Sequence, residues 1–196
     1  WQPINWQELW RYKDLFYFLV WRDIKTRYAQ SVLGIGWAVI QPVFSMIVFT
    51  IVFGNIAKIN SDGVPYAIFS YTALVPWTYF SGALTGASGS LLGASRMMTK
   101  VYFPRLVIPI APVISKLVDF GIAFVILLLM MAYFGFMPSI QIIYLPLLII
   151  IMMITASGMG MWLTAMAIQY RDINYAMSFF VQLLMYAAPV VYPASN

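Results

Sequence analysis

Residues 21–42 read WRDIKTRYAQSVLGIGWAVIQP, and this stretch decides the fold. Its first part carries Arg22, Lys25 and Arg27, whereas the remainder carries no charge. Positive charge followed at once by a long uncharged apolar run is typical of the point where a chain leaves the cytoplasmic surface and enters the bilayer. The stretch therefore predicts a membrane-spanning helix whose N-terminal side is cytoplasmic.

The composition of the chain also indicates an integral membrane protein. Of its 196 residues, 63% are hydrophobic and 9% are charged, compared with about 25% charged residues in soluble domains. The chain has no cysteine and no histidine, which excludes disulfides, Cys/His zinc sites and a histidine general base. It also has no P-loop and no catalytic triad, so we expect no catalytic residue, metal or cofactor on this chain.

Uncharged runs of about 20 residues, the length that a bilayer requires, define the predicted spans. We expect an all-α integral membrane protein with a single transmembrane domain over 1–196. An amphipathic segment over 1–30 lies on the membrane surface and is followed by five spans, with a kink at Pro42 in the first. A sixth helix is expected to be missing after the last span. The five predicted spans are 34–56, 66–92, 114–133, 143–168 and 175–188.

The distribution of Lys and Arg predicts the orientation. The N-terminal segment, the 96–105 loop and the loop at Arg171 contain nine of the eleven basic residues, and the alternate loops contain only Lys58. Short loops rich in Lys and Arg stay on the cytoplasmic side. The charges therefore predict a multi-pass topology with a cytoplasmic N-terminus, and they explain the net charge of +5 without nucleic-acid binding.

Lys116 and Asp119 are the ionisable residues well inside a predicted span. Three positions apart, they share one helix face and could form an ion pair. Charges inside a membrane often serve a substrate contact or a proton relay. The alternative is a structural pair in which the Lys reaches the membrane interface, and the spacing alone allows both.

Three further patterns allow two interpretations each. Small residues at Gly82, Gly86, Ser90 and Ala94 permit close helix packing, either within the chain or between two copies. The basic island 96–105 could dock a cytoplasmic partner or anchor the topology. Two stripes of aromatic and amide side chains could line a sugar path, or could serve helix packing and lipid contact. The stripes are Trp37, Gln41 and Phe44, and Tyr175, Phe179, Gln182 and Tyr186.

A set of short motifs, taken in order, covers nearly the whole chain. They are RDIKTRYAQSVLG at 22–34, Trp37, Gln41-Pro42, LVPW at 74–77, KVYFPR at 100–105, Arg171-Asp172 and PVVYP at 189–193. The chain resembles the membrane subunits of type-2 ABC exporters of O-antigen, capsule or teichoic-acid polymers. The motifs do not distinguish among these polymers.

The resemblance implies a permease in the bacterial cytoplasmic (inner) membrane that exports lipid-linked polysaccharide. It implies a homodimer in membrane lipid and a separate ABC ATPase subunit that binds the ATP and Mg. The two aromatic stripes would line the channel, and 189–193 would begin a re-entrant segment. The residues implied in ATPase coupling are Arg22, Lys25, Arg27, Tyr28, Arg96, Lys100, Phe103, Pro104 and Arg105.

Two other functions are compatible with a membrane protein of this composition. A membrane-embedded transferase acting on lipid-linked sugars would need carboxylates or histidines near the water interface, and Asp119 is the one acid inside a predicted span. An ion-driven secondary transporter usually shows an internal repeat, and the sequence contains none that we detect. Both remain alternatives to the permease.

Overall fold

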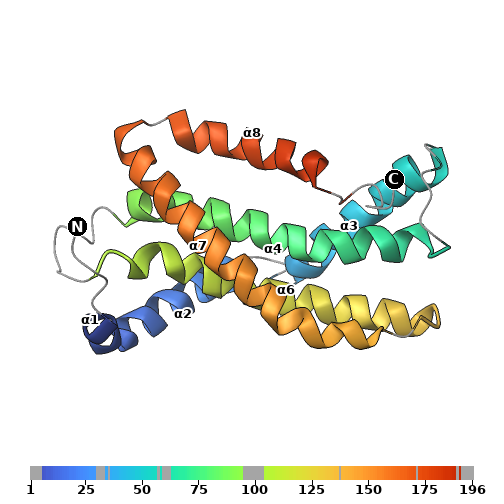
Figure 1. The fold of residues 1–196 in the computed structure, drawn as a ribbon, viewed down its shortest axis with the longest axis horizontal. Coiled ribbons are helices and arrows are strands. Elements are labelled where there is room, and N and C mark those ends of the chain that lie inside the picture. The colour runs from blue at the N-terminus through green and yellow to red at the C-terminus, as the bar shows by residue number, and fades with distance from the viewer. Residues whose placement is uncertain are drawn as a thin grey trace.

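The computed structural model describes residues 6–29, 34, 36–56, 58, 63–94, 104–136, 138–170, 172–188 and 190. In these residues all regular structure is helical (Figure 1), as the sequence predicts. The helices are α1 Trp6–Arg11, α2 Lys13–Ala29, α3 Gly36–Phe49, the π-helical η1 Thr50–Ile56, α4 Tyr66–Gly93, α6 Val107–Tyr133, the 3-10 helix η2 Ile140–Tyr144, α7 Leu145–Gln169 and α8 Asp172–Ala187.

Each predicted span coincides with a helix, and the largest difference is at the start of α6. This helix begins at Val107 rather than at residue 114. Pro109 lies in its first turn, where the missing N–H has no helical partner to lose. Pro112 lies inside the helix, so α6 continues through both prolines. The N-terminal segment is divided at Tyr12 into α1 and α2.

Three helical stretches are long and apolar enough to cross a membrane: Gly36–Ile56, Val107–Tyr133 and Ile140–Gln169. The apolar part of α8, Ala176–Ala187, is shorter. Among the described residues α4 does not reach the same hydropathy, although it has 28 residues. It packs against α3, α6, α7 and α8, and a helix shielded from lipid by its neighbours can carry small and polar residues. That α4 and α8 cross the membrane stays a prediction.

The main core forms where α4 meets α6 and α7. Figure 1 shows α4 running through the middle of the bundle, between α8 and α6, with α7 crossing it diagonally. The core residues contributed by α4 are Tyr71, Val75, Tyr79, Ala83 and Ala87, those of α6 are Val113, Phe120, Ala123 and Leu127, and α7 adds Ala156. This packing joins α6 to both α4 and α7.

The small residues of α4 pack within the chain. A Cβ atom added at Gly82 would lie 3.1 Å from Lys116 Cε, and one added at Gly86 would lie 3.1 Å from Pro112 Cβ. Both contacts are with α6, which confirms close packing within one chain for this part of the stripe. A Cβ at Gly89 would meet nothing within 4 Å.

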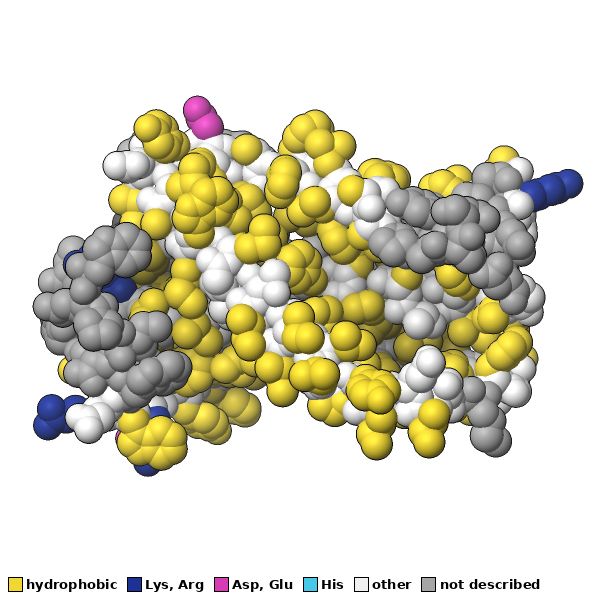
Figure 2. Space-filling model, viewed as in Figure 1, with side chains coloured by type: hydrophobic (Ala, Val, Ile, Leu, Met, Phe, Trp, Pro, Cys, Tyr) yellow, Lys and Arg dark blue, Asp and Glu magenta, His cyan; other side chains and the backbone are white. Residues whose placement is uncertain are grey.

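The two ends of the bundle differ in charge. Figure 1 places the end of α4, the start of α6, the end of α7 and the start of α8 at the end of the bundle that carries α1 and α2, and the start of α4 and the end of α6 at the opposite end. Figure 2 shows the visible Lys and Arg side chains gathered at the α1–α2 end, with one at the far end and mostly hydrophobic side chains between. The predicted topology requires successive helices to run in opposite directions and the basic side chains to gather at one end of the bundle, and the described residues fit both.

Candidate functional site

The carboxylate of Asp119, on α6, lies at the centre of a polar cluster. Its Oδ2 atom accepts hydrogen bonds from Lys116 Nζ at 2.8 Å and from Arg27 Nη1 at 2.9 Å. The Tyr28 hydroxyl donates to Oδ1. The ion pair between Lys116 and Asp119 confirms the pairing predicted from their spacing. The two contacts from α2 were not predicted.

A second contact runs beside the first. Arg27 Nη2 donates to Ser115 Oγ at 3.4 Å, and Ser115 Oγ donates to Pro112 O at 3.0 Å. Ser115 and Asp119 are one helical turn apart on α6, so they face the same neighbour. Arg27 and Tyr28 lie in the last turns of α2, so the C-terminal end of α2 is tied to the middle of α6. We call Arg27, Tyr28, Lys116 and Asp119 the Asp119 cluster.

The Asp119 cluster holds two cations and one carboxylate. Burial, followed by the hydrogen bond to Asp119, raises the pKa of Tyr28 from 10.0 to about 12. Tyr28 therefore stays protonated and acts as a neutral donor to the carboxylate. Both cations and the acid are partly exposed, with side-chain exposures of 29% for Arg27, 27% for Lys116 and 21% for Asp119. The cluster is thus a partly solvated network rather than a sealed core pair.

A pocket of about 190 Å³ opens beside the Asp119 cluster, between α3, α4 and α6. Its lining is mostly apolar, and we call it the polar pocket for the charged, amide and hydroxyl side chains that it also contains. It joins two predicted features, because Trp37 and Gln41 of α3 line it together with Lys116 and Asp119. Its other lining residues are Ala38, Pro42, Thr78, Tyr79, Ser81, Gly82, Phe120 and Ala123. An aromatic ring, an amide and hydroxyls around a small polar space can stack on a sugar ring and hydrogen-bond to its hydroxyls.

The rest of the two aromatic stripes lies on the surface. Phe44 of α3 is 66% exposed and is not among the residues lining the pocket. On α8, Phe179 and Tyr186 are more than 60% exposed and Gln182 is also exposed, while the side chain of Tyr175 lies outside the described part. These side chains are free to face another surface, and their role in lining a channel stays a prediction.

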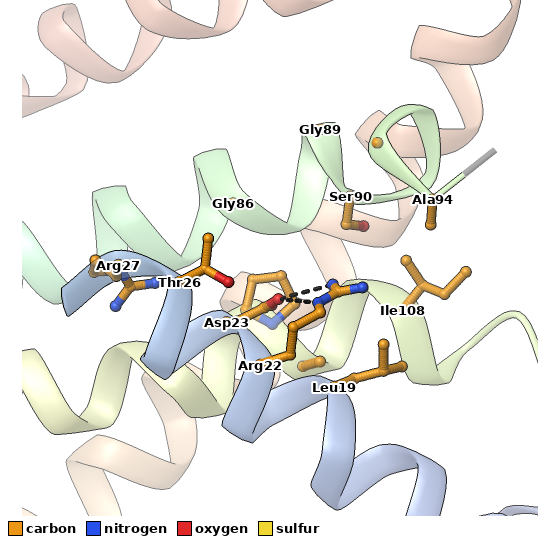
Figure 3. Close-up of a pocket in the computed structure, with 13 residues that line it drawn as sticks. Leu19, Arg22, Asp23, Thr26, Arg27, Gly86, Gly89, Ser90, Ala94 and Ile108 are labelled. Atoms are coloured by element: carbon orange, nitrogen blue, oxygen red, sulfur yellow. Dashed lines mark hydrogen bonds and ion pairs between the residues drawn. The ribbon is translucent and has the colours of Figure 1, made fainter. Parts of the chain in front are cut away.

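A wider groove of about 650 Å³ separates α2 from α4. Figure 3 shows α2 on one side of it and the small residues Gly86, Gly89 and Ser90 of α4 on the other. Arg22 lies in this groove and is held by Asp23, whose Oδ1 accepts from both Nε at 3.1 Å and Nη2 at 2.8 Å. The groove leaves the α4 side of α2 loosely packed.

The apolar residues of α2 lie on two sides of the helix. Leu19 is buried against Val107 and Ala111 of α6, whereas Phe18 and Trp21 are more than half exposed. The amphipathic pattern expected for the N-terminal segment is thus only partly present in α2. The exposed rings belong to the surface that also carries Lys25.

The residues implied in ATPase coupling have different environments. Arg22 and Lys25 are exposed, but Arg27 and Tyr28 turn toward Asp119. Pro104 is partly buried and Arg105 is exposed, just before α6. Arg96, Lys100 and Phe103 lie outside the described residues, as does most of the predicted re-entrant segment. The coupling role of the whole set stays a prediction.

Comparison with known proteins identifies the family. Residues 14–196 match the family described as ABC-2 type transporter. An O-antigen export system permease protein RfbA of Myxococcus xanthus is 29% identical over 190 residues, which cover 97% of this chain and 72% of the relative. Two proteins of the same name from Klebsiella pneumoniae are 26% and 24% identical over 180 residues, covering 91% of this chain and 69% of each relative. The family match spans nearly the whole chain and confirms the resemblance inferred from the motifs, so this multi-pass membrane protein belongs to the ABC-2 type transporter family.

Proposed function

We propose that this chain is the membrane-spanning permease subunit of an ATP-driven exporter that moves lipid-linked polysaccharide, of the O-antigen kind, across the cytoplasmic membrane. The observation that carries the proposal is the family match over residues 14–196. The substrate class rests on the names of the three relatives, each an O-antigen export permease. The N-terminus is assigned to the cytoplasm because nine of the eleven basic residues lie in the N-terminal segment, the 96–105 loop and the loop at Arg171.

The chain would contribute a channel wall rather than chemistry. The polar pocket offers Trp37 for stacking and Gln41 for hydrogen bonding, and the exposed Phe179 and Tyr186 of α8 extend the aromatic surface. In a homodimer such surfaces on two copies could face each other across one path. Sugars suit this lining because their rings present apolar faces and their edges present hydroxyls.

ATP would bind, with Mg, to a separate ABC ATPase subunit. On this chain the exposed cations of α2, Arg22 and Lys25, and the exposed Arg105 before α6 lie at the end assigned to the cytoplasm. They are therefore accessible to a cytoplasmic partner. Closure of two ATPase subunits on ATP would push on α2 and on the 96–105 loop, and that motion would open the path.

The environment of Asp119 argues against the transferase and against a proton relay. A general acid or a relay group must exchange its proton with a substrate or water. The Asp119 carboxylate instead accepts from Lys116, Arg27 and Tyr28. All three donors already occupy the carboxylate, which fits a structural or positioning role better than a proton-transfer role.

The experiment that tests the proposal is complementation of a strain from which the permease gene is deleted. We expect lipid-linked polymer to accumulate inside the deletion strain and surface polymer to return with the intact gene. A matched strain would carry the intact permease and a partner ATPase whose P-loop lysine is replaced. Surface polymer should be absent from that strain, and normal export in it would contradict the proposed function.

A further inference from the structure

We propose that Arg27 and Tyr28 are positioning residues that fasten α2 to Asp119, so that displacement of α2 is carried to the helix that lines the polar pocket. This inference rests on the proposed function, in which an ATPase acts on α2. The resemblance implies Arg27 and Tyr28 in ATPase coupling, and the structure adds their contact with Asp119 and, through it, with the polar pocket.

The helix α2 is supported mainly from one side. Among the described residues, α6 is the helix of the bundle against which α2 mainly packs. The groove of about 650 Å³ lies on its α4 side, and Phe18 and Trp21 are exposed on another side. Movement of α2 therefore reaches the rest of the molecule chiefly through its contacts with α6.

The helix α2 contacts α6 at two separate points, one apolar and one polar. One is apolar, where Leu19 meets Val107 and Ala111, and the other is polar, where Arg27 and Tyr28 meet Asp119. Leu19 and Arg27 are eight residues apart, as are Ala111 and Asp119, or about 12 Å along each helix. Two parallel helices joined at both ends of such a stretch resist sliding and rotation against each other.

Asp119 lies between α2 and the polar pocket. Its carboxylate accepts from α2, and the same side chain lines the polar pocket beside Gln41. A single residue thus joins the helix assigned to the cytoplasmic surface to a pocket whose other walls come from α3 and α4. Because α6 is packed into the main core through Phe120 and Ala123, a shift transmitted to it changes the pocket.

Lys116 keeps Asp119 paired when the contacts from Arg27 and Tyr28 are removed. Lys116 Nζ lies 2.8 Å from Asp119 Oδ2, and both residues belong to α6, so this pair does not need α2. Replacing Arg27 and Tyr28 therefore loosens α2 without leaving a lone carboxylate inside a span. The double variant Arg27→Gln with Tyr28→Phe is the clean test for this reason.

The test is polymer exported per ATP hydrolysed, measured on the permease reconstituted with its ATPase in proteoliposomes. In the double variant we expect this ratio to fall at least about fivefold, the lower range of measured couplings between sites, while ATP hydrolysis continues. Arg27→Lys, which keeps the charge, should retain most of the ratio. Lys13→Gln removes a charge from the start of the same helix and should leave it unchanged. An unchanged ratio in the double variant overturns the proposal.

A covalent rescue separates positioning from general damage. The chain has no cysteine, so Leu19→Cys combined with Val107→Cys or Ala111→Cys introduces one pair that oxidation can join. The resulting disulfide would link α2 to α6. In the double variant, the cross-link should restore the export ratio. Failure to restore it once the disulfide has formed contradicts the proposal.

Cross-linking without ATP tests the fastening even if the chain exports nothing. The disulfide should form more slowly, or to a lower yield, when Arg27 and Tyr28 are replaced than when they are present. Equal rates overturn the fastening. A slower rate together with no ATP-dependent export by the intact permease would keep the fastening and refute the proposed function.

Discussion

Asp119 is shared by two cations, and this sharing sets the order in which substitutions destabilise the protein. Asp119→Asn leaves Lys116 and Arg27 close together with no anion between them. Arg27→Gln leaves the pair of Lys116 and Asp119 intact. The two substitutions therefore have different expected costs, although each removes one partner of the same ion pair.

We expect Asp119→Asn to lower the free energy of unfolding by about 3 kcal/mol, the low end for breaking a buried pair by removing one partner, since the cluster is partly exposed. Arg27→Gln should cost about 1 kcal/mol or less, as partly solvated pairs do. Thermal unfolding in detergent micelles measures both. Asp23→Asn, which breaks the exposed pair with Arg22, is the control and should change little. Equal losses for Asp119→Asn and Arg27→Gln would contradict the shared-carboxylate arrangement.

At the residue scale, local spacing predicted only half of the Asp119 cluster. Lys116 and Asp119 are three positions apart, so helix geometry alone pairs them. Arg27 lies 92 residues away in the sequence, and no periodic pattern connects it to α6. The available signal was indirect: a carboxylate inside a span needs cationic partners, and Arg27 is the last cation before the first predicted span.

The contact between α4 and α7 depends on one glycine and one hydroxyl. A Cβ atom added at Gly160 would overlap the Cβ of Ala87. One turn later, Thr164 Oγ1 lies 2.8 Å from Ala87 O and is fully buried. The two helix backbones therefore approach closely at this point, and any added atom must push them apart.

Gly160→Ala should lower the free energy of unfolding by about 1–3 kcal/mol, the usual cost of adding atoms to a packed core. Gly158→Ala is the matched control, because it lies on the same helix and its added Cβ would meet nothing within 4 Å. Thermal unfolding in detergent should show a loss for the first variant and none for the second. Similar melting temperatures for both would show that the α4–α7 contact is not close-packed.

At the element scale, uncharged runs and turn residues predicted where helices lie, but not their ends or their type. The predicted span 114–133 missed the first two turns of α6, and Pro109 falls in the first of them, where proline is tolerated. The π-helical turn η1 was not predicted, because a π-helix has no distinct pattern of polar and apolar residues. The groove between α2 and α4 was also missed, since it depends on how helices pack rather than on their sequences.

The exposed aromatic side chains make a prediction about the assembly. If α3 and α8 face a second copy, single cysteines at Phe44 or Phe179 should cross-link two chains in the membrane. Ile154 of α7 is equally exposed but belongs to neither stripe, and a cysteine there should not cross-link. Dimers captured at Ile154 and not at Phe44 or Phe179 would place the interface elsewhere.

At the scale of the whole molecule, we propose that ATP hydrolysis by a separate subunit drives polymer through this permease. The most direct test of this proposal is transport of a labelled lipid-linked polysaccharide in proteoliposomes that contain the permease, with or without the ATPase. We expect the fraction of polymer that external glycosidase can cleave to change with time only when both subunits and ATP are present. Transport by the permease alone on an ion gradient, or chemical change of the polymer without transport, would contradict it.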